Sequence, residues 1–192
     1  MKLLEDRIIM EGAVLPGNVL KVGSFLNQKI DTKLLRSMAE ETARLYEGQG
    51  INKIMTVEAS GIAFAAAVGM VMDLPVLFAK KHQSSNVDGE TLAYHAHSYT
   101  HNTDYNMVVS RAYLTPSDHV LLVDDFLANG AALNALTELV RMSGASLAGV
   151  AVCIEKRFQG GGDTLRAKGI RVEALALIES MEDGKIKFAH TI

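Results

Sequence analysis

The chain has 192 residues, of which 48% are hydrophobic, and it carries a formal net charge of -3 with three prolines, one cysteine and no tryptophan. This length and composition are typical of one globular domain, residues 1–192, and exclude a disordered or fibrous chain. The negative charge gives no basic field for a polyanion, and Cys153 has no second cysteine with which to form a disulfide. We therefore expect no nucleic-acid partner and a cytoplasmic location. Because no apolar run reaches membrane-spanning length, we also expect no membrane partner.

Helical spacing marks the first part of the chain. Apolar residues recur every three or four positions from Leu3 to Ile9 and from Leu34 to Leu45, which predicts two amphipathic helices. Between them, the glycines and mixed pattern of residues 17–31 predict a short strand and an irregular loop.

From Lys53 onward, apolar strands alternate with helices. The pattern predicts strands at 53–57, 75–79, 119–123 and 146–154, helices at 61–72 and 130–142, and two further candidate strands at 171–180 and 185–189. Such alternation favours an α/β fold with a mainly parallel sheet flanked by helices.

The stretch from His82 to Asp118 departs from that alternation. Two runs that flank the polar residues 101–104 predict a long hairpin or flexible flap. His95 and His97 share a strand face and His101 lies nearby, but no cysteine or close carboxylate completes a metal site. We therefore interpret these histidines as polar residues of a mobile hairpin.

Two adjacent carboxylates, Asp124 and Asp125, follow the apolar strand at 119–123. Charged side chains do not stabilise an apolar core, so their place at the end of a buried strand indicates a function. Small residues come next and lead into a helix, so backbone amides and the positive helix end could hold an anion. The carboxylates could accept hydrogen bonds from sugar hydroxyls or hold a hydrated Mg²⁺. Together they suit a ligand with a ribose and a phosphate. The structural alternative is a helix cap beside a tight turn.

The run VLLVDDFLANGAAL, residues 120–133, resembles the phosphoribosyl-pyrophosphate motif of the type I phosphoribosyltransferases. The resemblance extends to GAVLPGNVLKVGSFLNQKID, EASGI and IEKRFQ, which are similar to the bacterial members that use xanthine. It implies transfer of 5-phosphoribosyl from phosphoribosyl pyrophosphate to xanthine in purine salvage, with Mg²⁺ carried by the pyrophosphate substrate. It also implies a homodimer and a small purine hood formed by the N- and C-terminal segments.

By this resemblance, Asp124 and Asp125 would hold the ribose hydroxyls. The loop enclosing the 5-phosphate would be Ala128, Asn129, Gly130, Ala131 and Ala132. The family commonly has threonine around the loop glycine, so backbone amides must carry more of the phosphate binding here. Hypoxanthine-guanine members place an aspartate at the position of Ala128, which argues against that branch.

Two further strand ends carry candidate residues. Ser60 and Gly61 lie in the loop after strand 53–57, and the matching loop of the family binds pyrophosphate; a helix cap with a packing glycine is the alternative. Lys80 and Lys81 follow strand 75–79 and could neutralise a departing pyrophosphate, with Lys81 as a catalytic candidate, although a solvated strand end explains them equally well.

The purine would lie beyond the ribose. Lys156 could donate to a purine 6-oxo group and Phe158 could stack on the base, which favours oxopurines over adenine. The family match adds Leu20 and Asn27 of the hood to the base site. Without the family match, residues 155–158 would be interpreted as a solvated charge cluster.

We hypothesise displacement at the anomeric carbon through an oxocarbenium-like transition state, with Mg²⁺ and Lys80 or Lys81 easing the departure of pyrophosphate. No general base is evident. The competing hypotheses are a ligand-sensing regulator of purine genes, which would need an added DNA-binding domain, and an enzyme that uses guanine or adenine.

Overall fold

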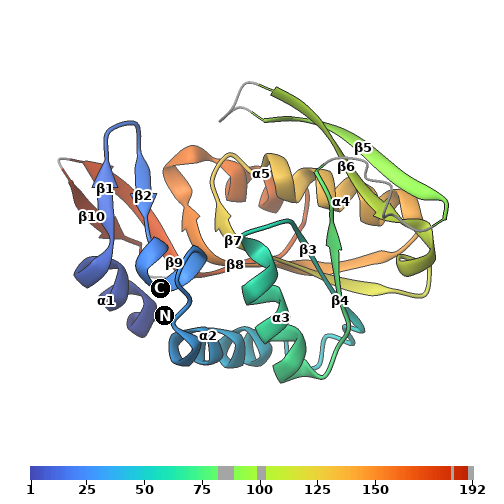
Figure 1. Ribbon diagram of the computed structural model, residues 1–192, viewed down its shortest axis with the longest axis horizontal. Coiled ribbons are helices and arrows are strands. Elements are labelled where there is room, and N and C mark those ends of the chain that lie inside the picture. The colour runs from blue at the N-terminus through green and yellow to red at the C-terminus, as the bar shows by residue number, and fades with distance from the viewer. Residues whose placement is uncertain (82–88, 99–102, 183, 190–192) are drawn as a thin grey trace.

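The computed structural model describes residues 1–81, 89–98, 103–182 and 184–189, and its centre is a six-stranded sheet (Figure 1). The strand order is β10-β9-β8-β7-β3-β4. The strands are β3 (Lys53–Val57), β4 (Val76–Ala79), β7 (His119–Leu127), β8 (Ser146–Lys156), β9 (Val172–Glu182) and β10 (Lys185–Phe188). All neighbours run parallel except β10, which is antiparallel to β9. The predicted mainly parallel sheet is confirmed.

Helices cover both faces of this sheet (Figure 1). They are α1 (Lys2–Glu11), α2 (Thr32–Leu45), α3 (Gly61–Met72), α4 (Ala131–Ser143) and α5 (Gly161–Ala167). One core cluster joins α2 and α3 to the sheet through residues such as Met38, Phe64 and Leu121. The other joins α4 through residues such as Leu122 and Leu136. Burial on both faces explains why the strand sequences are continuously apolar.

A small hood precedes α2. It consists of β1 (Ala13–Leu15), β2 (Val19–Lys21) and a π-helical turn, Gly23–Asn27. Its side chains Leu20 and Phe25 are buried in the same core cluster as α2 and α3. Ile186 and Phe188 of β10 pack against that cluster as well, so segments from both ends of the chain meet there.

The predicted hairpin is confirmed as β5 (Thr91–Ser98) and β6 (Thr103–Ser110). It is attached to the sheet edge because Lys80, just beyond β4, exchanges backbone hydrogen bonds with Val108 at 2.9 and 2.8 Å. Two 3-10 turns, Arg111–Tyr113 and Arg157–Gln159, follow β6 and β8. None of the helices in the described ranges is long and apolar enough to cross a membrane.

The sequence pattern was wrong about where β7 ends and missed α5. The apolar run stops at Val123, but β7 continues to Leu127 because its backbone remains paired with β8 as far as Leu127 and Glu155. Likewise β8 continues through Lys156 rather than ending at Ile154. Helix α5 begins in a run of three glycines, which have poor helix propensity and hide its start.

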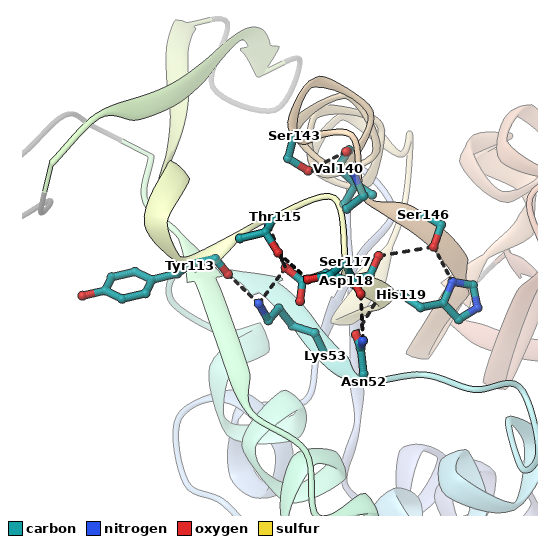
Figure 2. A network of polar contacts seen from close by, with 11 residues as sticks. Asn52, Lys53, Tyr113, Thr115, Ser117, Asp118, His119, Val140, Ser143 and Ser146 are labelled. Atoms are coloured by element: carbon teal, nitrogen blue, oxygen red, sulfur yellow. Dashed lines mark hydrogen bonds and ion pairs between the residues drawn. The ribbon is translucent and has the colours of Figure 1, made fainter.

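A polar network joins the amino-terminal ends of β3, β7 and β8 (Figure 2). Lys53 Nζ donates to Asp118 Oδ2 at 2.8 Å and to the Tyr113 carbonyl at 2.7 Å, and the Thr115 N–H donates to the same carboxylate oxygen at 2.7 Å. Asn52 accepts from the His119 N–H at 2.7 Å. These bonds fix the segment that returns from the hairpin into β7.

Asp118 is the centre of this network, and its pKa reflects two opposing influences. Burial is the largest influence and raises the pKa, but the hydrogen bonds from Lys53 and Thr115 outweigh it and leave the pKa of Asp118 below its ordinary 3.8. The folded state therefore favours the charged carboxylate.

We expect Asp118→Asn to lower the free energy of unfolding at neutral pH by about 2 kcal/mol, because it removes the charge that Lys53 contacts. The carboxylate's contribution is complete above its unfolded pKa and is lost as the pH falls through the lowered folded pKa. Urea unfolding from pH 7 downward should therefore show a smaller acid-induced loss in the variant, with Asp6→Asn on the surface of α1 as control. Identical losses in parent and variant would contradict this role.

Candidate active site

The candidate site lies at the carboxyl end of the sheet, between β3 and β7. From this pair the chain proceeds in opposite directions, through α3 to β4 and through α4 to β8. Ligands of open α/β sheets bind at such a reversal point. The register pairs β3 with β7 only as far as Met55 and Leu122, whereas β8 stays paired up to Leu127. The end of β7 is therefore held from the β8 side alone, and it carries Asp124 and Asp125.

Asp125 joins three segments that are distant in the sequence. One carboxylate oxygen accepts from Ser60 Oγ at 2.9 Å, and the other accepts from Asn27 Nδ2 at 3.1 Å. Ser60 precedes α3, and Asn27 ends the π-helical turn of the hood. Asp125 is only 5% exposed, so these two bonds fix its orientation.

Asp124 is also buried, with 6% exposure, and its Oδ1 accepts from the Asp125 N–H at 2.9 Å. Burial first, and then the charge of Asp125, raise the pKa of Asp124 well above its ordinary 3.8, while the charge of Lys81 acts in the opposite direction. A cation or hydroxyl donor entering the site would favour the ionised form.

Gly61 gives these groups the room they occupy. A Cβ at this position would lie 2.6 Å from Asp124 Oδ1 and 2.4 Å from Thr56 Oγ1. The Thr56 hydroxyl is buried and has no hydrogen-bond partner within the described part of the chain. The glycine expected in this loop is therefore required by the position of the Asp124 carboxylate.

The two lysines differ in how the fold holds them. The backbone of Lys80 pairs with β6, as described above. The Lys81 N–H donates to Glu58 Oε1 at 2.9 Å, and the Glu58 N–H donates to the Ala79 carbonyl at 3.0 Å. Glu58 thus ties the end of β4 to the β3–α3 turn, in which the Glu58–Ala59 peptide is cis.

The loop of residues 128–132 connects β7 to α4 and turns at Gly130, whose φ is 80°. The Ala131 N–H donates to the side chain of Asn129 at 3.1 Å. Within the described residues, the backbone N–H groups of Asn129, Gly130 and Ala132 donate to no protein acceptor. Three donors beside a helix N-terminus are thus available to an anionic ligand.

Lys156 is half-buried at the end of β8. Its Nζ donates to the Asn18 carbonyl of the hood at 2.8 Å and lies 5.5 Å from the centroid of the Phe126 ring. Burial lowers the pKa of Lys156. The aromatic ring beside this lysine is therefore Phe126, whereas Phe158 lies in the following 3-10 turn with 38% exposure. Leu20 of the hood is 7% exposed.

Some of the expected site residues contact one another, and others do so only through their charge or not at all. Asn27, Ser60 and Asp125 are in direct contact, and Lys81 acts on Asp124 through its charge. Sequence reasoning missed Glu58 and Phe126. Glu58 belongs to the quoted motif EASGI, and Phe126 directly follows the acidic pair, but their contacts depend on the lengths of β4 and β7.

Of the three histidines of the predicted hairpin, the structure describes the side chain of His95. His95 Nδ1 lies 3.1 Å from Asn106 Oδ1 across the hairpin. The side chain of His97, all of His101, and residues 82–88 and 99–102 of the expected hairpin or flap lie outside the described residues. Among the residues that are described, no group of three or more His, Cys, Asp or Glu side chains could hold a metal ion.

Comparison with known proteins adds independent information. Residues 22–167 match the family described as phosphoribosyl transferase domain. A xanthine phosphoribosyltransferase of Lachnoclostridium phytofermentans is 50% identical over 98% of both chains, and one of Heliobacterium modesticaldum is 49% identical over 98% of this chain and all of the relative. The structure of an adenine phosphoribosyltransferase of Giardia lamblia with 9-deazaadenine is 19% identical, covers 91% of this chain and 96% of that one, and has a TM-score of 0.75, which shows a common fold. The chain therefore belongs to the phosphoribosyltransferase family and has the type I phosphoribosyltransferase fold.

Proposed function

We propose that this chain transfers the 5-phosphoribosyl group of phosphoribosyl pyrophosphate to xanthine, which yields xanthosine 5′-monophosphate and pyrophosphate. The observation that carries this proposal is the juxtaposition of two buried carboxylates with a loop of available backbone N–H groups. The choice of xanthine is supported by relatives named xanthine phosphoribosyltransferase that match almost the whole chain at about half identity.

The ribose is assigned to Asp124 and Asp125. Each oxygen of the Asp125 carboxylate accepts one protein hydrogen bond and keeps a further lone pair for a sugar hydroxyl. The 5-phosphate is assigned to the N–H groups of the loop 128–132, which follows directly on β7. A ribose and its phosphate are thereby bound by consecutive segments of one strand and turn.

Mg²⁺ is proposed to enter with phosphoribosyl pyrophosphate. The adjacent carboxylates of Asp124 and Asp125 are oxygen ligands of the kind that Mg²⁺ prefers, directly or through water. The raised pKa of Asp124 supports this assignment, because a divalent cation would compensate the repulsion between the two carboxylates.

The purine is assigned to the space bounded by Lys156, Phe126 and the hood. Lys156 Nζ keeps donors beyond its bond to Asn18 and could meet a 6-oxo group. Asn27, the last residue of the hood, donates to Asp125, so this side chain connects the hood to a carboxylate assigned to the ribose. Oxopurines present a carbonyl oxygen at C6 to such donors, whereas adenine presents an amino group at that position.

In the reaction, the bond from the anomeric carbon to pyrophosphate breaks and a bond to a purine nitrogen forms. Positive charge develops on the ribose ring, where the Asp124 and Asp125 carboxylates can stabilise it. The pyrophosphate carries the departing electron pair toward Lys81 and the β3–α3 turn. The purine gives up one proton in the exchange, and an acidic purine such as xanthine needs little help from a protein base to lose it.

The homodimer implied by the resemblance is also proposed here. Met70 and Val71 of α3 and Phe78 of the edge strand β4 expose large apolar side chains. Covering them would remove apolar surface from water, which gives a second copy a reason to bind at this edge.

The reaction is tested most simply by its product. We expect incubation with phosphoribosyl pyrophosphate, Mg²⁺ and each of xanthine, guanine, hypoxanthine and adenine to give xanthosine 5′-monophosphate fastest, as identified by liquid chromatography and mass spectrometry. Faster formation of adenosine 5′-monophosphate, or no nucleotide at all, would contradict the proposal.

We expect Asp125→Asn to reduce kcat/KM for phosphoribosyl pyrophosphate by about 100-fold, because a charge that stabilises the ribose in the transition state is lost. The amide can keep one of the two bonds from Ser60 and Asn27, so the thermal midpoint should change little. Asp6→Asn, which changes an exposed acid on α1, is the matched control. Parent-like turnover by a folded Asp125→Asn protein would refute the ribose assignment.

We expect Lys156→Met to raise the KM for xanthine by about 10- to 100-fold, the range for losing a charged hydrogen bond, with little change in the KM for phosphoribosyl pyrophosphate. Lys156→Arg, which keeps the charge, should be affected less. Initial rates with each substrate varied in turn separate the two constants. An equal rise in both KM values would instead indicate a general disturbance of the hood.

A further inference from the structure

The backbone of helix α5 contacts the backbone of the loop 128–132, which is called the phosphate loop below. The Gly161 N–H donates to the Ala128 carbonyl at 3.1 Å. A Cβ on Gly161 would lie 2.4 Å from that carbonyl oxygen and 2.6 Å from both the Asn129 carbonyl carbon and the Gly130 nitrogen. These are main-chain atoms that cannot rotate aside as a side chain would. Only glycine fits at residue 161 while the loop keeps this shape.

This contact determines where the loop N–H groups point. Because the peptide unit is planar and trans, the Ala128 carbonyl and the Asn129 N–H point in opposite directions. The carbonyl is directed at Gly161 of α5, so the Asn129 N–H is directed away from α5, where it has no protein acceptor among the described residues. The bond from Gly161 therefore orients one of the donors assigned to the 5-phosphate.

A second link runs from the other end of α5. Lys168, which directly follows the helix, donates from Nζ to Asn134 Oδ1 at 2.7 Å. Asn134 Nδ2 in turn donates to the Gly130 carbonyl at 2.9 Å. The loop is thus held at Ala128 and at Gly130, on either side of Asn129.

Helix α5 is itself fixed to the sheet by a partly buried ion pair. The two terminal nitrogens of the Arg166 guanidinium, Nη1 and Nη2, donate to the Glu155 carboxylate, each at 2.7 Å, and Glu155 is 0% exposed. Arg166 also donates to the Val172 carbonyl at 3.3 Å. Glu155 directly precedes Lys156, so one ion pair connects the strand end that carries Lys156 to the helix that holds the loop.

We propose that α5 is a bracket that sets the geometry of the phosphate loop, and that Gly161 is its positioning residue. Gly161 acts through the loop and touches no substrate. The proposal rests on the function proposed above, because that function assigns the 5-phosphate to this loop. It accounts for a glycine that the chemistry of the site does not itself require.

The test is Gly161→Ala, in which the methyl group must displace residues 128–130. We expect the KM for phosphoribosyl pyrophosphate to rise by about tenfold or more, because misplacing a binding group by a fraction of an ångström weakens it strongly. The KM for xanthine should stay near its parent value. Calorimetric titration with ribose 5-phosphate should show the same loss of affinity.

Asn134→Ala gives a second test without added bulk. It removes the Asn134 side-chain bond to Gly130 and the contact with Lys168, and we expect a rise of about fivefold in the KM for phosphoribosyl pyrophosphate. Thr164→Ala is the control, because it removes a side-chain bond to the carbonyl of Gly160, which precedes α5, and touches neither the loop nor Arg166. Its KM values should match those of the parent protein.

The outcomes separate the two proposals. If the parent protein binds neither phosphoribosyl pyrophosphate nor ribose 5-phosphate, the proposed function is wrong. If the parent binds them and folded Gly161→Ala binds them equally well, the bracket is wrong. Should Gly161→Ala fail to fold, Asn134→Ala decides: a selective rise in the KM for phosphoribosyl pyrophosphate supports the bracket, and unchanged constants or parallel rises in both KM values overturn it.

Discussion

The unequal pairing of β7 is the constraint on which the rest of the site depends. On one side β3 is registered with β7 only to Leu122, while on the other side β8 follows it to Leu127. The last residues of β7 are therefore held rigidly by one neighbour and approached on the other side by the β3–α3 turn and the hood. Asp125 lies at this meeting point and bonds to Ser60 and Asn27, one residue from each of those segments. An acidic side chain there acts on the hood, the turn and any ligand together.

Burying two carboxylates side by side costs free energy, because each loses its hydration and they repel each other. The protein compensates the two carboxylates to different degrees. Asp125 receives two side-chain donors that compensate its charge. Asp124 receives one backbone N–H, and burial and its neighbour raise its pKa. The described protein groups therefore compensate Asp124 poorly, and a cation or hydroxyl donors would supply the missing interaction. Proteins commonly retain such incomplete compensation where a ligand binds, because the ligand then supplies the missing interaction.

Much of the fold could be predicted because side-chain patterns report burial directly. The bounds of β3 and α3, Lys53–Val57 and Gly61–Met72, agree with the sequence prediction residue for residue. The continuation of β7 through Asp124 and Asp125 could not be predicted, since it depends on backbone pairing with β8 and leaves no apolar signal. Helix α5 was missed because its glycines contradict helix propensity. A side chain at Gly161 would meet the backbone of the loop, and one at Gly162 would meet the Glu155 carboxylate.

In the candidate site, too, some features could be predicted from the sequence and others could not. The acidic pair and the loop after it could be identified because they are contiguous in the sequence. The contact of Asn27 with Asp125 spans 98 positions, and no local pattern encodes it. Phe126 lies beside Lys156 because both β7 and β8 extend beyond their apolar runs.

The central claim is that the end of β7 binds the ribose and the loop after it binds the 5-phosphate. A crystal structure with bound xanthosine 5′-monophosphate tests this claim most directly. We expect the ribose hydroxyls within hydrogen-bonding distance, about 2.5 to 3.0 Å, of the carboxylates of Asp124 and Asp125, and the phosphate oxygens on the N–H groups of Asn129, Gly130 and Ala132. A nucleotide whose phosphate lies away from this loop, or whose ribose leaves both carboxylates without contact, would contradict the account.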